Sequence, residues 1–219
     1  NVLGAYHYCG CYFCYNSEYI VSILERIVNY LEKLYRAIRL DSELYEEVEA
    51  DKSLTRQALV TVALVAIIEG VFYLGAQDQG LVIGLSQSIL GSVTRWVMWA
   101  FFIAFVGTRI VPEPETESNT GELLRTLGFA YAPGVFYIFA SLPIIGSIVQ
   151  LLVPLWQLAA MVVAVRQALD FSSTTRAIGV CVVAFFLMVL TLILFIMFTS
   201  FFLAVASNAV PVETPLIGT

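Results

Sequence analysis

The chain has 219 residues, of which 59% are hydrophobic and only 13% are charged, and its mean hydropathy is +0.85. Soluble domains are about 45–50% apolar and about 25% charged, so this composition excludes a water-soluble domain, a secreted disulfide module and a disordered tail. The formal net charge of -6 argues against a nucleic-acid partner, because such binding depends on basic residues that neutralise phosphates. The sequence therefore predicts an integral membrane protein.

Residues 1–20 differ from the rest of the chain because they are rich in aromatic residues and cysteine. They do not form a recognisable signal peptide, since no basic segment precedes their apolar residues. We treat them as an N-terminal extension, and a start near Val21 is the alternative. A structural zinc site normally combines two separated pairs of ligands, so we predict no metal here. The weak candidates for such a site are His7, Cys9, Cys11 and Cys14.

Residues 21–56 are predicted to form cytoplasmic helices, the first of which is amphipathic. Its apolar residues recur at spacings of three and four, which places them on one stripe of a helix. The stripe consists of Ile20, Leu24, Ile27, Leu31, Leu34 and Ile38. Such a helix can lie in the headgroup layer, with its basic residues on anionic lipid, or its stripe can pack on the bundle or on a partner helix. The basic residues are Arg26, Lys33, Arg36 and Arg39.

A short acidic helix is expected after this amphipathic one. Asp41 is a suitable N-cap for it, and Asp51 or Ser53 can cap the first span. The acidic residues of the short helix are predicted to form a solvated face. They are Glu43, Glu46, Glu47 and Glu49.

Charged residues delimit the candidate spans, because a charge at the centre of a bilayer costs at least about 2.5 kcal/mol. The run 57–76 contains one charge, Glu69, and the run 86–111 contains Arg95 before it closes at Arg109. Each run is long enough to cross a hydrocarbon core of about 30 Å as a helix. These runs are predicted to be the first and second spans.

A third uncharged run, between Arg125 and Arg166, contains 40 residues. As one helix it would measure roughly 60 Å, about twice the thickness of a hydrocarbon core. The run must therefore fold back on itself. Pro143 and Gly146 supply the turn, because proline ends a helix and glycine tolerates a reversal. The uncharged run 177–212 provides the last span, so the sequence predicts five spans.

The positions of the Lys and Arg residues agree with five spans. Six of them precede the first span, Arg109 and Arg125 flank the second loop, and Arg166 and Arg176 flank the fourth. The other two loops and the tail carry none, and positive residues stay on the cytoplasmic side during insertion. We therefore predict an all-α, polytopic helical bundle in the cell membrane with a cytoplasmic N-terminus. Its five-helix domain covers 57–206, and 207–219 form a short extracytoplasmic tail.

Glu69 and Arg95 are the two ionisable residues expected at membrane depth. Counted from the cytoplasmic ends of their spans, Glu69 lies roughly 18 Å deep and Arg95 roughly 21 Å deep. Two interpretations of these matching depths stay open. The residues form an ion pair that fixes the register of antiparallel neighbours, or Glu69 titrates in a proton or anion site.

Small residues recur at every fourth position at the start of the second span. They are Gly80, Gly84, Ser88 and Ser92. Such a ladder lets helices approach closely, and it can serve the contact with the first span or a dimer contact.

Three segments carry a family resemblance: YEEVEADKSLTRQAL, LLRTLGFAYAPGVF and WQLAAMVVAVRQALDFSSTTRAIGV. In this order, around five spans, they resemble the prokaryotic members of the Yip1 family over roughly residues 23–200. The most specific part contains Arg125, Gly128, Tyr131 and Pro133. The resemblance implies the five-span architecture. Eukaryotic relatives recruit small GTPases through a cytoplasmic signature that this sequence lacks, so GTPase recruitment is not implied.

The leading hypothesis is a non-enzymatic membrane scaffold, or an accessory subunit of a larger membrane complex. The chain has one His, outside the predicted spans, so histidine cannot ligate a cofactor within them; no cofactor is predicted. Expected partners are the lipid bilayer, other membrane proteins or a second copy, with possible lipid or carotenoid contacts along a phenylalanine-rich last span. The alternative is a small transporter or channel that uses Glu69 and Arg95. Phenylalanines of the last span are Phe185, Phe186, Phe195, Phe198, Phe201 and Phe202.

Overall fold

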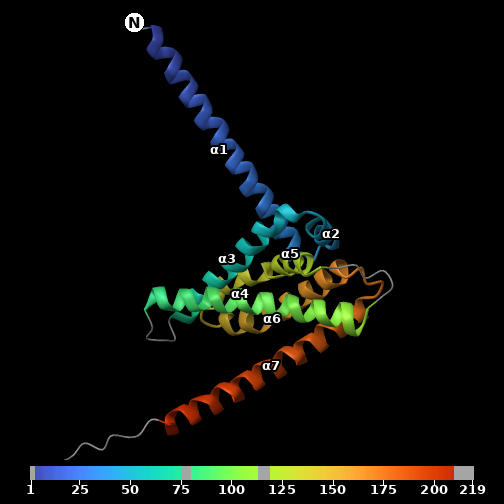
Figure 1. Ribbon diagram of the computed structural model, residues 1–219. Coiled ribbons are helices and arrows are strands. Elements are labelled where there is room, and N and C mark those ends of the chain that lie inside the picture. The colour runs from blue at the N-terminus through green and yellow to red at the C-terminus, as the bar shows by residue number, and fades with distance from the viewer. Residues whose placement is uncertain (1–2, 75–79, 113–118, 210–219) are drawn as a thin grey trace, which may run out of the picture.

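The computed structural model describes residues 3–74, 80–112 and 119–209 (Figure 1). Every element among them is helical, which confirms the all-α fold. In chain order the elements are α1 (Leu3–Ile38), α2 (Ser42–Ala50), the 3₁₀ turn η1 (Lys52–Leu54), α3 (Thr55–Leu74), α4 (Leu81–Phe105), the π-helical turn η2 (Val106–Ile110), α5 (Thr120–Ala130), the 3₁₀ segment η3 (Ala132–Phe139), α6 (Ile145–Ala168) and α7 (Thr174–Ala209).

Four helical stretches in the described part of the chain are long and apolar enough to cross a membrane. They are Lys52–Val71, Leu81–Ile110, Ile145–Ala168 and Thr174–Val205. They coincide with the first, second, fourth and fifth spans expected from the sequence. The protein is thus a multi-pass membrane protein built from apolar helices.

The expected third span is not one continuous helix. Its residues form α5 and then η3, which meet at Tyr131. Pro133 lies in the first turn of η3 and has no backbone N–H to donate to the preceding turn. The backbone therefore tightens into a 3₁₀ helix at this point. The chain then reverses near Pro143, where Ile144 adopts a positive φ of 73° before α6 begins.

Side-chain caps begin the short helices α2, η1 and α5. The Asp41 carboxylate accepts a hydrogen bond of 3.1 Å from the backbone N–H of Glu43, and Asp51 accepts one of 2.8 Å from Ser53. At the start of α5, Asn119 and Glu122 form a reciprocal capping box. The predicted caps Asp41 and Asp51 are therefore both present in the structure, Asp51 acting on η1 immediately before α3.

Helix α5 occupies the centre of the protein, where it contacts α2, α3, α4 and α6. Its side chains Leu123, Leu127 and Phe129 are fully buried. The backbone of α5 also lies directly against α3: a Cβ atom added at Gly128 would sit 2.7 Å from the Cβ of Ala58. Glycine at this position thus lets the two helices pack backbone to backbone.

Helices α1 and α7 extend away from this centre in different directions (Figure 1). Leu34 and Ala37, near the C-terminal end of α1, are buried, whereas Leu24 and Leu31 are more than half exposed. Along α7, the residues near Val180 and Ala184 pack on the bundle, and the later phenylalanines are exposed. Each helix therefore presents a long apolar surface that the rest of this chain does not cover.

Candidate functional site

Glu69 on α3 and Arg95 on α4 form an ion pair within the membrane-spanning part of the protein. Arg95 Nη2 lies 3.1 Å from Glu69 Oε2. Ser92 connects the two, because its hydroxyl donates to the same carboxylate oxygen at 3.2 Å and accepts from Arg95 Nη2 at 3.2 Å. The Glu69 side chain is 16% exposed and that of Arg95 is 50% exposed. The carboxylate is therefore enclosed, while the guanidinium reaches beyond the helix pair.

The small-residue ladder lies only partly in the contact between α3 and α4. The Ser88 hydroxyl donates to the Ala66 carbonyl at 2.7 Å, and Ser92 belongs to the ion-pair cluster. A Cβ added at Gly70 would lie 2.9 Å from the Cβ of Ser88, so the helices are close here. Gly84 is half-buried. Gly80 precedes α4 and a Cβ added there would meet no atom within 4 Å, so it takes no part in this packing.

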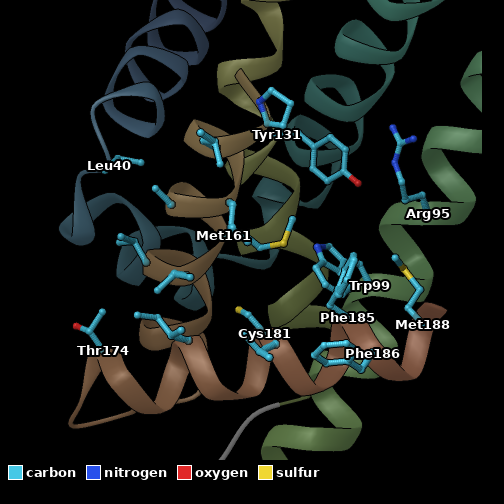
Figure 2. A pocket seen from close by; sticks show the side chains of 18 residues that line it. Leu40, Arg95, Trp99, Tyr131, Met161, Thr174, Cys181, Phe185, Phe186 and Met188 are labelled. Carbon is cyan, nitrogen blue, oxygen red and sulfur yellow. The ribbon is translucent and has the colours of Figure 1, made fainter. Parts of the chain in front are cut away.

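Beyond the ion pair lies a cavity of about 1020 Å³ between α4, α6, α7 and the junction of α5 with η3. Arg95 and Tyr131 line one part of it, and Figure 2 shows the Tyr131 hydroxyl directed toward the Arg95 side chain. The rest of the wall is almost entirely apolar, with Trp99, Met161 and Phe185 among its residues. Sequence reasoning did not predict this cavity, because its walls come from five segments that are far apart in the chain, including Leu40 after α1.

Arg125 on α5 is a second site where charge is buried, with only 4% of the residue exposed. Its Nε donates to the Val48 carbonyl at 3.1 Å, and its Nη2 donates to the Glu49 carbonyl. These carbonyls belong to the last turn of α2, where the helix leaves acceptors without intrahelical partners and carries partial negative charge. The guanidinium therefore caps α2 and ties it to α5.

Several carboxylates lie around this cap, and the pKa of one of them, Glu49, is changed by its surroundings. Burial raises the pKa of Glu49 to about 7, and repulsion from Asp170 and Glu122 acts in the same direction. Because the pKa is raised in the folded protein, the protonated form is the one that folding favours. The contribution of Glu49 to stability is therefore lost as the pH rises through about 7.

The four residues of the family motif thus have distinct places. Arg125 caps α2, Gly128 allows α5 to pack against α3, and Tyr131 lines the cavity beside Arg95. Pro133 is buried at the start of η3, where the α-helical ladder stops.

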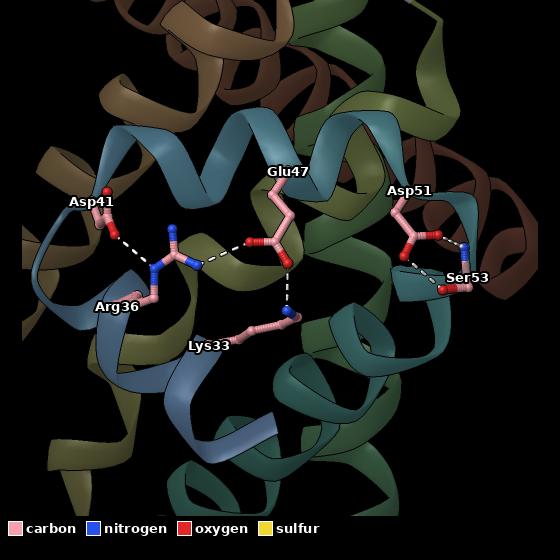
Figure 3. Close-up of polar contacts among 6 residues, drawn as sticks. All are labelled: Lys33, Arg36, Asp41, Glu47, Asp51 and Ser53. Atoms are coloured by element: carbon pink, nitrogen blue, oxygen red, sulfur yellow. Dashed lines mark hydrogen bonds and ion pairs between the residues drawn. The ribbon is translucent and has the colours of Figure 1, made fainter. Parts of the chain in front are cut away.

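Three ion pairs fix the C-terminal end of α1 to α2 and its N-cap (Figure 3). Lys33 Nζ lies 2.5 Å from Glu47 Oε1, and Arg36 contacts both Glu47 Oε2 at 2.9 Å and Asp41 Oδ2 at 2.7 Å. The Arg36 hydrogen bond lowers the pKa of Asp41, and the Lys33 hydrogen bond lowers that of Glu47. Opposite charges on two successive amphipathic helices were the sequence signal for this contact.

These pairs change the interpretation of the acidic and basic residues around α1. Glu47 is not simply a solvated carboxylate, because it accepts from two cations. Lys33 and Arg36 are engaged within the protein, and the Arg39 guanidinium lies 5.6 Å from the centre of the Tyr35 ring. The set of basic residues expected to contact anionic lipid is thereby reduced.

The four candidate metal ligands, His7, Cys9, Cys11 and Cys14, have side chains outside the described part of the structure. Among the described residues there is no group of three or more His, Cys, Asp or Glu side chains arranged to hold a metal ion. The described cysteine, Cys181, is buried in α7 and free.

The long apolar helices, with an ion pair between two of them, define a multi-pass helical membrane protein. The Yip1 domain model matches residues 41–209, which is more than three quarters of the chain. The chain therefore belongs to the Yip1 family. The matched region begins at the cap of α2 and ends with α7. No curated protein and no solved structure matches the chain.

We expect the variant Arg95→Leu to lower stability more than the double variant Glu69→Leu/Arg95→Leu. The single change leaves an enclosed carboxylate with Ser92 as its remaining partner, whereas the double change removes both charges. The expected difference is roughly 1–3 kcal/mol, below the roughly 3–5 kcal/mol of a fully buried pair, because Arg95 is half exposed. Thermal melting in mild detergent measures it, with Arg109→Leu, an exposed arginine after the same helix, as the control. Equal losses in the single and double variants would show that the pair is not coupled.

Replacing Arg125 by alanine should lower stability by roughly 2–4 kcal/mol, because two charge-assisted hydrogen bonds disappear and the carbonyls at the end of α2 lose their donor. Arg125→Lys should recover only part of this, since an ammonium lacks the planar fork of donors. Arg56→Ala, at an exposed arginine in α3, is the matched control. The measurements are detergent melting and the rate of proteolysis within 41–51. A lysine variant as stable as the natural protein would contradict the capping role.

Proposed function

We propose that this protein is a non-enzymatic membrane scaffold that acts as an accessory subunit of a larger membrane complex. The observation that carries the proposal is the part of α1 that projects from the bundle (Figure 1), where the apolar stripe is exposed. Leu24, Ile27 and Leu31 are 54%, 48% and 57% exposed, whereas Leu34 in the same stripe is 6% exposed. The stripe therefore packs on this chain at its last turns and is free to contact another molecule before them.

The charges on α1 favour an apolar partner helix over an anionic lipid surface. Lys33 and Arg36 are already paired with α2. The projecting part of the described stripe carries Arg26 together with Glu25 and Glu32, which gives it no excess of positive charge. An interfacial helix on anionic lipid depends on such an excess. Partner packing through the apolar stripe needs none, and the ion pairs to α2 hold the helix in a defined direction for it.

The five-span topology is part of the same proposal, with α5 and η3 together as a broken third span. The 11 residues of α5 and the 8 residues of η3 would extend over about 32 Å at the rises of α and 3₁₀ helices. That length is similar to a hydrocarbon core of about 30 Å. Non-helical or broken backbone is tolerated at membrane depth where protein covers it, and residues 123–134 are almost all buried. The N-terminus would then be cytoplasmic and the C-terminus extracytoplasmic.

Reporter fusions test this topology. A fluorescent protein that matures only in the cytoplasm should be bright when fused after Asp170 and dark when fused at the C-terminus. Alkaline phosphatase should give the opposite pattern, because it is active only after export. If α5 and η3 do not cross the membrane, both positions change sides, so the pattern would be reversed. A fusion ahead of Asp41, cytoplasmic in either case, controls for expression.

Native mass measurement after extraction in mild detergent tests the role as a subunit. We expect the natural chain and the variant Asn29→Asp to co-purify with one defined membrane protein in a fixed ratio. The double variant Ile27→Asp/Leu31→Asp should lose that protein while keeping its own melting temperature, because these side chains do not support the bundle. Asn29→Asp is the matched control, since it places one carboxylate on an exposed position of the same helix. A natural chain recovered only as a monomer or homodimer would refute the proposal.

A further inference from the structure

The cavity between α4, α6 and α7 has two chemically different parts. Most of its wall is hydrocarbon or aromatic, and among the residues that line it Arg95 is the one formal charge. Its volume of about 1020 Å³ is at the upper end of the roughly 300–1,000 Å³ of small-molecule sites. A cavity of this kind suits a molecule with a long apolar body and a single polar group.

Arg95 and Tyr131 define where that polar group would lie. Both hydrogen bonds that Arg95 makes to Glu69 and Ser92 use Nη2. The Nε and Nη1 groups are further N–H donors on a side chain that is half exposed. Figure 2 shows the Tyr131 hydroxyl directed toward this guanidinium at the edge of the cavity. The Tyr131 hydroxyl and the Arg95 guanidinium also hydrogen-bond to each other, so the hydroxyl accepts from Arg95 and keeps its own hydrogen to donate to a further acceptor atom.

The charge balance indicates that this acceptor is uncharged. Glu69 and Arg95 already compensate each other at 3.1 Å. An anionic group beside Arg95 would leave a net negative charge at membrane depth, where an uncompensated charge is costly. A carbonyl oxygen accepts hydrogen bonds from the same donors without that cost.

The wall next to the donors is suited to a flat ring. Trp99 and Phe185 contact each other edge to face, with ring centres 6.4 Å apart, and both line the cavity. Farther along, Leu155, Leu158 and Ile178 line a part of the cavity where these side chains are about half exposed, so it opens to the apolar surface of the protein. A chain attached to the ring could leave by this opening directly into lipid.

We propose that the cavity binds an uncharged isoprenoid lipid with a carbonyl on its terminal ring, held by hydrogen bonds from Arg95 and Tyr131. An isoprenoid quinone and a ketocarotenoid share this chemistry. In either case the ring lies against Trp99 and Phe185, and the isoprenoid chain follows the surface of α6 and α7. The site is independent of the α1 stripe, so its test does not depend on the partner proposed above.

Quenching of tryptophan fluorescence measures binding, since Trp99 is in the wall. The full-length chain in phosphatidylcholine nanodiscs is titrated with a short-chain menaquinone and, separately, with canthaxanthin. β-Carotene serves as the carbonyl-free reference and palmitate as the anionic one. We expect saturable quenching by at least one of the two carbonyl probes, and the probe that binds shows whether the ligand is a quinone or a ketocarotenoid. Its affinity should be at least about tenfold higher than the affinity of either reference. Equal affinities for β-carotene and the carbonyl probes, or tighter binding of palmitate, would overturn the proposal.

Two variants identify the site. Tyr131→Phe removes one hydroxyl and should weaken carbonyl-probe binding about fivefold, the effect of one neutral hydrogen bond, while leaving β-carotene unchanged. Tyr35→Phe, at an exposed tyrosine of α1 that does not line the cavity, is the matched control and should bind normally. Ala159→Phe places a ring into the cavity and should abolish saturable binding while the melting temperature is kept. Normal binding by either cavity variant would overturn the proposal, because the probe would then lie elsewhere. If the protein is a dimer and Ala159→Phe dissociates it, the cavity holds part of a second copy and the proposal is also overturned.

Discussion

The Arg125 guanidinium is the interaction on which the arrangement of α2 and α1 depends. It is a buried cation, and its partners are backbone carbonyls at the end of α2 rather than a carboxylate. A charge in this position holds α2 against α5, because losing either carbonyl would leave a buried donor unpaired. Helix α2 in turn carries Asp41 and Glu47, which bind Arg36 and Lys33 of α1. Arg125 thus fixes the position of α2, and α2 in turn fixes the direction in which α1 leaves the bundle.

Within the membrane, the ion pair of Glu69 and Arg95 plays a comparable part, but its two side chains differ in exposure. Its carboxylate is enclosed and bonded to both Ser92 and Arg95, whereas half of the guanidinium remains accessible. If the pair served only to join α3 and α4, we would expect both side chains to be enclosed between the two helices. The asymmetry leaves donors beside Tyr131 at a cavity that is otherwise apolar. Arg95 therefore takes part both in the contact between α3 and α4 and, with Tyr131, in the polar contact point proposed for a lipid.

Much of this arrangement was predictable from the sequence, because it follows from short-range patterns. Charge-delimited runs predicted five spans, four of which coincide with long apolar helices. Matching depths favoured a contact between Glu69 and Arg95 as one of two interpretations, and the two side chains lie 3.1 Å apart. Capping chemistry identified Asp41 and Asp51. The sequence could not reveal the cavity, since Trp99, Tyr131 and Phe185 are distant in the chain and each has an ordinary packing interpretation. It also could not show that Lys33 and Arg36 are engaged by α2, because basic residues on an amphipathic helix are equally typical of lipid contact.

The break between α5 and η3 connects these observations. The backbone through residues 120–139 is not one α-helix, because Pro133 ends the α-helical ladder and Gly134 follows with its Cα close to Val65. Tyr131 lies immediately before this break, at the C-cap of α5. The change of helix type turns the backbone where α5 would otherwise continue, and Tyr131 there lies at the cavity beside Arg95 (Figure 2). The motif that runs from Arg125 to Pro133 therefore does two things in nine residues: it caps α2 at one end and places the Tyr131 hydroxyl at the cavity beside Arg95 at the other.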